Sequence, residues 1–308
     1  MNAALIAIDW GTSNLRASLL DAGGRPIETR TAPGGIMAVP ERRFADALLK
    51  LCGDWIDTHA VPLIASGMIG SRQGWQEAPY IGCPAGLASA AAQLVRVEVK
   101  PGVLLHIVPG ICCIGADGVS DVMRGEETQL WGAGLTAGTC CVLPGTHSKW
   151  AWLGEAGSID RFETFMTGEL YGLLTKHGIL GRLMTFGAWR PEVFEAGVRL
   201  GLAQHANALH VIFAARTAGL MGKIDAEGLP DYLSGILIGI EIAGATAHQP
   251  QRSVTLLGDD ELCTRYEAAL SIAGMSSMRA ADGSTTHGQW RVAEAAGLLT
   301  ARYQGTVQ

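Results

Sequence analysis

A short internal repeat limits the folds open to this chain more than any other feature of the sequence. Residues 6–23 match residues 140–157 when the two segments are laid over each other. The shared identities include two Gly-Thr pairs, Gly11-Thr12 and Gly145-Thr146, and each pair follows an apolar run. An apolar run, a glycine turn and an alternating stretch are typical of a β-hairpin. The repeated hairpin therefore predicts two similar domains.

The elements that follow the two hairpins are also alike. In the first half we expect a helix over 44–56, strands at 61–65 and 103–108, and a helical stretch from about 120 to 131. In the second half we expect a helical insertion over 167–248, strands at 254–257 and 276–280, and helices at 260–272 and about 290–302. The order βββαβαβα, present twice, predicts the α/β class with a cleft between two domains. We place the domains at 1–133 and 134–308, and expect the last helix to brace the first domain.

Composition and charge exclude several classes of protein. The formal net charge is -6 and no long Lys/Arg run occurs, so neither nucleic acid nor a membrane is expected as a partner. The seven cysteines show no C-x-x-C spacing, which favours reduced thiols over a zinc site. The N-terminus has no basic segment or cleavage site, and charged residues interrupt the longest apolar stretch, 229–247. We therefore expect a cytoplasmic protein.

The two Gly-Thr turns are the candidate phosphate sites. No G-x-x-x-x-G-K-[ST] loop occurs, so a bound phosphate needs backbone N–H groups and small hydroxyls that converge from turns. We assign phosphate binding to Gly11, Thr12, Ser13, Asn14, Gly145, Thr146, His147 and Ser148. Asp9 comes just before the first turn, where a carboxylate could hold Mg²⁺, although a turn-forming role is the alternative.

Five motifs occur in a fixed order along the chain. They are Asp9–Arg16 (DWGTSNLR), Ser66–Arg72 (SGMIGSR), Asp121–Gln129 (DVMRGEETQ), Leu143–Trp150 (LPGTHSKW) and Phe165–Leu170 (FMTGEL). Together they resemble the 2-dehydro-3-deoxygalactonokinase family of the actin/hexokinase/Hsp70 ATPase superfamily. The resemblance implies duplicated domains of the actin-like ATPase (ribonuclease H-like) fold and the use of ATP with Mg²⁺. It also implies phosphorylation of the C6 hydroxyl of 2-dehydro-3-deoxygalactonate, in bacterial galactonate and galactose catabolism.

Phosphoryl transfer to an alcohol needs a carboxylate that accepts the hydroxyl proton. Asp121 is the first candidate, because hexokinase-like enzymes carry their catalytic Asp at a similar position. Its alternative role is a first-turn Asp favoured by the helix dipole. Glu126 is the second candidate, with a solvated helix face as its alternative.

The acid implied by the resemblance carries a carboxylate, which a guanidinium can hold with two parallel bonds. Arg72, in a Gly-Ser-rich loop, and Arg16, inside a strand, compete for that role. The other residues that we assign to the substrate are Ser66, Met68, Trp75 and Tyr80. For the adenosine we assign Gly258, Ser234 and Gly235, although the Asp259-Asp260 pair departs from the glycine found there in many members of the superfamily.

Two other interpretations stay open at the level of sequence. The chain could be a kinase for another sugar acid or an amino sugar, or an actin-like ATPase without kinase activity. Against the second, the chain ends soon after its second βαβα unit, which leaves no peptide-binding domain. The expected partners are small molecules, namely ATP and the sugar acid, and a homodimer is left open.

Overall fold

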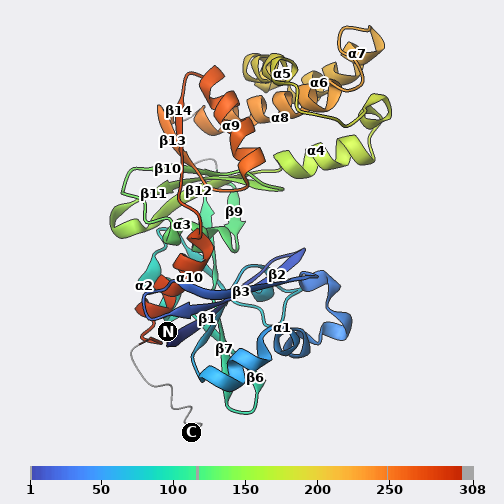
Figure 1. The fold of residues 1–308 in the computed structure, drawn as a ribbon. Coiled ribbons are helices and arrows are strands. Elements are labelled where there is room, and N and C mark those ends of the chain that lie inside the picture. Colours follow the sequence, from blue (N-terminus) through green and yellow to red (C-terminus); the bar gives the residue numbers. More distant parts are fainter. Residues whose placement is uncertain (1, 116–117, 248, 300–308) are drawn as a thin grey trace. The chain divides into compact units, whose positions relative to one another are not determined.

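The computed structural model describes residues 2–115, 118–247 and 249–299, which form two compact units (Figure 1). Unit 1 contains the described residues of 1–139, 152–162 and 281–308. Unit 2 contains those of 140–151 and 163–280. Each unit holds a mixed sheet with helices, which confirms the expected α/β class.

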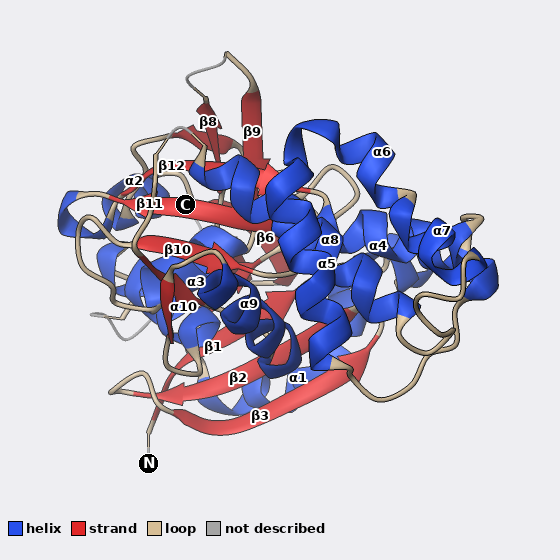
Figure 2. Ribbon diagram, turned by 90° about the horizontal axis from the view of Figure 1, so that it is seen from above, coloured by secondary structure: helices blue, strands red, loops and turns tan. Residues whose placement is uncertain are grey.

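The main sheet of unit 1 has the strand order β3-β2-β1-β4-β7-β6. Its strands are β1 (Ala3–Trp10), β2 (Asn14–Asp21), β3 (Pro26–Pro33), β4 (Leu63–Ser66), β6 (Val95–Lys100) and β7 (Val103–Ile107). The predicted first hairpin is present, because β1 pairs antiparallel with β2, and the two lie beside β3 in Figure 2. The strands β1, β4 and β7 are parallel neighbours, so their carboxyl ends share one edge. Helix α1 (Phe44–His59) buries Phe44, Leu48 and Trp55 in the same core cluster as residues of β1.

A second sheet of unit 1 corrects the helix expected over 120–131. It has the order β5-β8-β9, with β5 (Tyr80–Gly82), β8 (Gly110–Ile114) and β9 (Ser120–Met123). Asp121 is therefore in a strand, opposite Cys113 of β8, and does not open a helix. Gly125, with φ of 110°, separates that strand from α3 (Glu126–Gly132). The sequence analysis missed this break because a strand of four residues is too short for its pattern to be told from that of a helix.

The last helix of the described chain packs within unit 1. We expected it at about 290–302, whereas α10 spans Ser284–Ala295 and residues 300–302 lie outside the described part. It begins early because Gly283, with φ of 81°, turns the chain immediately before Ser284. Helix α10 contacts α3, α2 (Leu87–Ala92) and β1. The approach to α3 is close, since a Cβ on Gly288 would lie 1.9 Å from the carbonyl oxygen of Thr128.

The sheet of unit 2 has the order β12-β11-β10-β13-β14. Its strands are β10 (Cys140–Leu143), β11 (Ser148–Leu153), β12 (Ile159–Phe165), β13 (Ser253–Leu256) and β14 (Ser276–Arg279), and residues 152–162 are grouped with unit 1. The neighbouring strands β10 and β11 form the second predicted hairpin. Helix α9 spans Asp260–Ile272 as expected, because the Asp259 side chain accepts hydrogen bonds from the backbone of Glu261 and Leu262 at its start.

The predicted helical insertion is a group of helices in unit 2 (Figures 1 and 2). They are α4 (Thr167–Lys176), α5 (Pro191–Gln204), α6 (Ala208–Ile212), α7 (Ala214–Leu220) and α8 (Leu229–Thr246). Helices α5 and α8 approach closely at glycines, since a Cβ on Gly201 would lie 2.3 Å from the carbonyl oxygen of Ile236. Gly235 and Gly239 of α8 make the reciprocal close contacts with α5.

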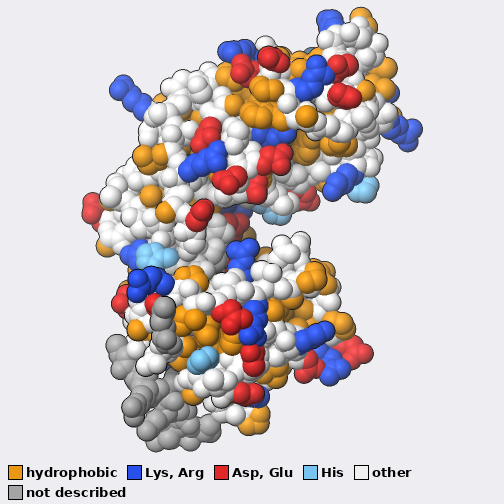
Figure 3. All heavy atoms as spheres, in the orientation of Figure 1, with side chains coloured by type: hydrophobic (Ala, Val, Ile, Leu, Met, Phe, Trp, Pro, Cys, Tyr) orange, Lys and Arg blue, Asp and Glu red, His pale blue; other side chains and the backbone are white. Residues whose placement is uncertain are grey.

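Surface charge, helix hydrophobicity and cysteine pairing can be read from the structure. On the face drawn in Figure 3, basic and acidic side chains are interspersed. In the described part of the chain, no helix is both long enough and apolar enough to span a bilayer. None of the seven cysteines, all within the described part of the chain, forms a disulfide, and all but Cys83 and Cys112 are buried.

Candidate active site

Asp9 lies at the edge of the unit 1 sheet where the parallel strands end. It pairs with Arg16 across β1 and β2, and it is in register with Ser66 at the end of β4. Burial raises the pKa of the Asp9 carboxyl above its usual value, while the charge of Arg16 acts in the opposite direction. Loops beyond the carboxyl ends of parallel strands are the usual place for ligands in α/β folds.

The first Gly-Thr turn follows Asp9 directly. Thr12, Ser13 and Asn14 are exposed, and the Gly11 N–H donates to the Asn14 carbonyl oxygen at 3.0 Å. Gly35 packs tightly against the backbone of the turn, because a Cβ there would lie 2.0 Å from the Thr12 carbonyl oxygen. The turn therefore presents small polar side chains to solvent on a closely packed base.

A second turn in unit 1 reaches the same edge. Gly125 lies against Gly67, since a Cβ on Gly125 would be 3.2 Å from the Gly67 Cα. A Cβ on Gly67 would in turn be 3.6 Å from Asp9 Oδ1. The fully buried Glu127 holds this turn, because its Oε2 accepts from the Gly125 N–H at 2.6 Å. Burial, and then the charge of Glu126, raise the pKa of Glu127 to about 7.

Three of the residues predicted to bind the substrate pack in or against the core of unit 1. Ser66 is buried, and its Oγ accepts from Gln289 Nε2 of α10 at 2.8 Å, so it is part of the core hydrogen bonding. Met68 packs against the core, and Trp75 stacks on Phe44 with ring centroids 6.2 Å apart.

The two candidate arginines for the carboxylate are both exposed. Arg72 projects into solvent and forms an ion pair with Glu77 at 3.1 Å. Arg16 is exposed on β2 beside Asp9. Tyr80 is 43% exposed, and the guanidinium of Arg124 lies 4.4 Å from its ring centroid. Arg124, which the sequence analysis did not select, is therefore the buried arginine beside the loop that contains Arg72.

The second Gly-Thr turn, in unit 2, packs on the first turn of α4. The Glu169 N–H donates to the Thr146 carbonyl oxygen at 2.9 Å, and a Cβ on Gly168 would lie 2.3 Å from the Gly145 carbonyl oxygen. Thr146 and His147 are exposed, and the His147 ring is hydrogen bonded to Glu169. Ser148 differs from its neighbours, because it is fully buried and its hydroxyl is bonded to Tyr266.

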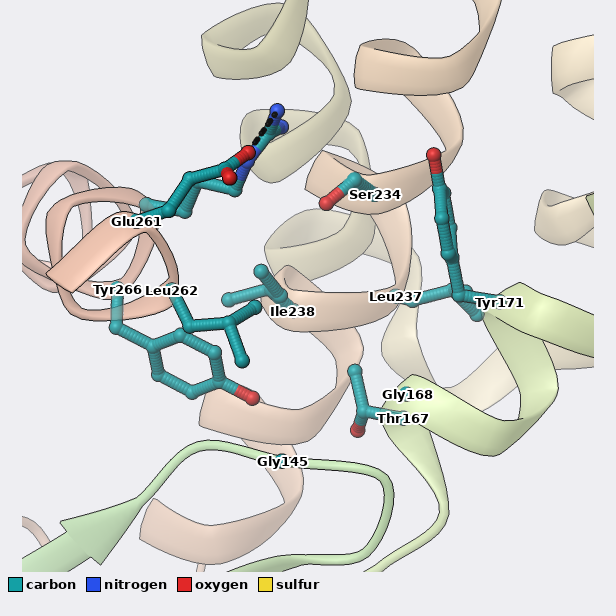
Figure 4. A pocket seen from close by; sticks show the side chains of 11 residues that line it. Gly145, Thr167, Gly168, Tyr171, Ser234, Leu237, Ile238, Glu261, Leu262 and Tyr266 are labelled. Carbon is teal, nitrogen blue, oxygen red and sulfur yellow. Dashed lines mark ion pairs between the residues drawn. The ribbon is translucent and has the colours of Figure 1, made fainter. Parts of the chain in front are cut away.

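Beside this turn lies a cavity of about 190 Å³, lined by residues of α4, α8, α9 and the turn itself (Figure 4). Leu237, Ile238 and Leu262 form its apolar part, and Ser234 and Thr167 contribute hydroxyls. Gly145 lines it as well, so the structure brings two of the predicted nucleotide residues, Gly145 and Ser234, to one cavity. Gly235 instead faces α5, where a Cβ would lie 2.1 Å from the Phe194 carbonyl oxygen.

A buried carboxylate holds one wall of the cavity. Glu241 accepts hydrogen bonds from Trp150 Nε1 at 2.8 Å, from the Tyr266 hydroxyl at 2.7 Å and from Thr167. Burial raises the pKa of Glu241, and the three donors act in the opposite direction. Because Thr167 and Tyr266 also line the cavity, Glu241 sets the position of both side chains.

Gly258 and the acidic pair after it lie where β13 leads into α9. Gly258 is exposed and lies close to Pro144, which precedes the Gly145 turn. Asp259 caps α9, and Asp260 forms an ion pair with Arg279 at 2.9 Å. The two aspartates that depart from the superfamily pattern thus have structural partners here.

The two candidate bases lie in different elements, Asp121 inside β9 and Glu126 at the start of α3 after the Gly125 turn. Asp121 Oδ1 accepts from the Val122 N–H at 2.8 Å, and Glu126 Oε2 accepts from the Arg124 N–H at 3.1 Å. The sequence analysis missed Glu127 and Arg124 although both belong to the quoted Asp121–Gln129 motif. It also missed Glu241, for which the sequence carries no local signal.

The fold gives the class of protein. The chain has the actin-like ATPase fold, which sugar kinases share. A solved structure with a likeness of fold alone is the activator of 2-hydroxyisocaproyl-CoA dehydratase from Clostridium difficile, with a TM-score of 0.50 and 11% identity over 94% of this chain and 95% of that one.

The particular family follows from sequence. The profile of the 2-keto-3-deoxy-galactonokinase family matches residues 9–292. The 2-dehydro-3-deoxygalactonokinase of Escherichia coli strain K12 is 37% identical over 89% of this chain and 91% of its own length. A crystal structure from Sinorhizobium meliloti, provisionally described as a 2-dehydro-3-deoxygalactonokinase, has a TM-score of 0.83 and 33% identity, covering 94% of this chain and 96% of that one. The chain belongs to the 2-keto-3-deoxy-galactonokinase family.

Proposed function

We propose that this protein transfers the γ-phosphate of ATP to the C6 hydroxyl of 2-dehydro-3-deoxygalactonate, giving 2-dehydro-3-deoxy-6-phosphogalactonate and ADP. The observation that carries the proposal is the family match over residues 9–292, together with 37% identity to the E. coli kinase over most of both chains. The reaction belongs to galactonate and galactose catabolism. Seven cysteines without a disulfide among them fit a reducing compartment, so we place the protein in the cytoplasm.

The unit 2 cavity is the proposed site of the adenine ring. Its volume of about 190 Å³ is below the roughly 300 to 1,000 Å³ of sites that enclose a whole drug-sized ligand, so it suits one ring system. Apolar walls from α8 and α9 would contact the ring faces, and Ser234 would supply a hydrogen bond. The adjacent turn at Gly145 and Thr146 would contact phosphate oxygens through its N–H groups.

Asp9 is the proposed carboxylate for Mg²⁺. The described residues contain no group of three or more His, Cys, Asp or Glu side chains suited to a metal. Magnesium in kinases commonly uses one or two carboxylates together with phosphate and water oxygens, and Asp9 beside the exposed Thr12 turn fits that donor set. The ion would neutralise phosphate charge. Asp121 is the proposed acceptor of the C6 hydroxyl proton, with Glu126 as the alternative.

A coupled ADP-release assay tests the function. The purified protein is given ATP, Mg²⁺ and a set of 2-keto-3-deoxy acids that includes the galactonate and gluconate epimers. We expect the highest kcat/KM with the galactonate epimer and little ADP release without an acid. A higher kcat/KM for another acid would reassign the substrate, and ADP release that is independent of any acid would refute the kinase function.

Asp9→Asn tests the metal assignment. The substitution is nearly isosteric, so we expect the fold to be kept and the Mg²⁺ concentration needed for half-maximal rate to rise. An unchanged Mg²⁺ dependence would remove Asp9 from the metal site.

A further inference from the structure

Arg124 is a buried cation that lacks a compensating anion. Its side chain is 8% exposed, and its Nη2 donates to the Ala78 carbonyl oxygen at 2.7 Å. The remaining nitrogen atoms, Nε and Nη1, are buried and have no hydrogen-bond partner. Among the described residues the structure gives Arg124 no ion pair. A buried charge without a partner is strongly unfavourable, so this environment favours the binding of an anion.

The guanidinium lies under the loop that the sequence analysis assigned to the sugar acid. A Cβ on Gly70 would lie 2.9 Å from Arg124 Nη1, and the Tyr80 ring centroid is 4.4 Å from the guanidinium carbon. The next residue of the loop, Ser71, also has a buried hydroxyl without a partner. Apart from three indole nitrogens, the buried side-chain nitrogen and oxygen atoms without a partner in the described part of unit 1 belong to Arg124 and Ser71. Both therefore occur around Gly70.

The residue after Arg124 lies at the edge of the unit 1 sheet where Asp9 and the first Gly-Thr turn are found. A Cβ on the following residue, Gly125, would lie 3.2 Å from the Gly67 Cα, and a Cβ on Gly67 would lie 3.6 Å from Asp9 Oδ1. One short segment thus connects the buried cation with the turn beside the proposed Mg²⁺ ligand. A sugar acid presents its carboxylate at one end and its C6 hydroxyl at the other, so two separate subsites in this region match its shape.

We propose that Arg124 binds the carboxylate of the sugar acid, with the Ser71 hydroxyl as a second donor. This assignment rests on the proposed function. A guanidinium binds the two oxygens of a carboxylate through two N–H groups that point the same way. Nη1 has no partner and Nη2 carries a second N–H besides the one that bonds Ala78, so these two nitrogens can form that pair. Nε and Nη1 are both buried and Gly70 lies against Nη1, so the loop around Gly70 lifts from Arg124 when the acid enters. Arg72 is less suited, because it is 80% exposed and already paired with Glu77.

The test compares the acid with its methyl ester, which lacks the charge but keeps the C6 hydroxyl. For Arg124→Met we expect the KM of the acid to rise about 10- to 100-fold, the range for losing hydrogen bonds to a charged group. The KM of the ester should stay within about twofold of that of the parent. Arg96→Met, at an exposed position on β6 of the same unit, is the matched control, and the KM of the acid should not change in it. A rise in that KM for Arg72→Met with none for Arg124→Met would return the carboxylate to Arg72 and overturn the proposal.

Arg124→Lys keeps the positive charge but cannot make two parallel hydrogen bonds to a carboxylate. It serves as a second variant if Arg124→Met does not fold. We expect a smaller rise in the KM of the acid, and a smaller increase in Tm on adding the acid than the parent shows. If either variant weakens acid and ester equally, Arg124 only holds the loop through Ala78, and the proposal is wrong. A parent that releases no ADP with the acid would instead refute the proposed function, and this assignment with it.

Discussion

Glu127 should make the stability of this protein depend on pH in a direction opposite to that of an ordinary salt-bridged carboxylate. Its side chain is fully buried, and burial raises its pKa from the usual 4.5 to about 7. Between these pH values the folded protein keeps a proton that the unfolded chain releases. The free energy of unfolding therefore falls as pH rises through this window.

The magnitude follows from the two pKa values. Each pH unit in the window changes the free energy of unfolding by about 1.4 kcal/mol for one proton. The step from 4.5 to about 7 thus amounts to about 3 kcal/mol by pH 8. Other carboxyl groups titrate too, so the quantity to measure is the difference between the parent and Glu127→Gln. Glutamine resembles the protonated acid, since its oxygen can accept from the Gly125 N–H and its amide can donate to Thr128 Oγ1.

Urea unfolding of both proteins at pH 5, 6, 7 and 8 gives this difference. At pH 5 we expect the two stabilities to agree within about 1 kcal/mol. At pH 8 the glutamine variant should be the more stable one by about 2 to 3 kcal/mol. Glu126→Gln, which removes the neighbouring charge, should lower the pKa of Glu127 and narrow the window. A difference that stays constant from pH 5 to pH 8 would refute the reasoning, because Glu127 would then titrate alike in both states.

Four further substitutions probe other parts of the structure. Gly288→Ala should lower the free energy of unfolding by about 1 to 3 kcal/mol, because its Cβ would meet the α3 backbone, whereas Gly172→Ala in open space on α4 should raise it by up to about 1 kcal/mol. Equal effects in urea unfolding would contradict the close helix contact. Glu241→Leu removes the acceptor of three donors, of which those of Trp150 and Tyr266 are buried, so the unfolding free energy should fall by at least about 2 kcal/mol and the KM for ATP should rise. An unchanged KM for ATP would separate Glu241 from the nucleotide. Asp121→Asn should lower kcat about 10²- to 10⁴-fold with little change in either KM, and a kcat near that of the parent would transfer the role of base to Glu126.

Local signals in the sequence predicted the parts of the fold that local physics controls. Both hairpins were predicted from an apolar run followed by Gly-Thr, and both are present. The bounds of α9 agree with the prediction, because an N-terminal cap and a helical apolar pattern act over a few residues. The strand at Asp121 was mistaken for a helix. Its pairing with β8 is a contact with another segment, and the residues of the strand do not contain that information.

The sequence by itself determined the α/β class, the repeated hairpins and the family motifs. Only the tertiary structure decided which polar side chains of those motifs are buried and what surrounds them. Arg72 and Arg124 are alike as residue types, yet one is exposed beside Glu77 and the other is buried without a carboxylate. Glu241 likewise meets Trp150 only because distant segments pack together. The physical reason is that backbone preferences act between near neighbours in the chain, whereas desolvation and charge pairing depend on every segment that packs around a group.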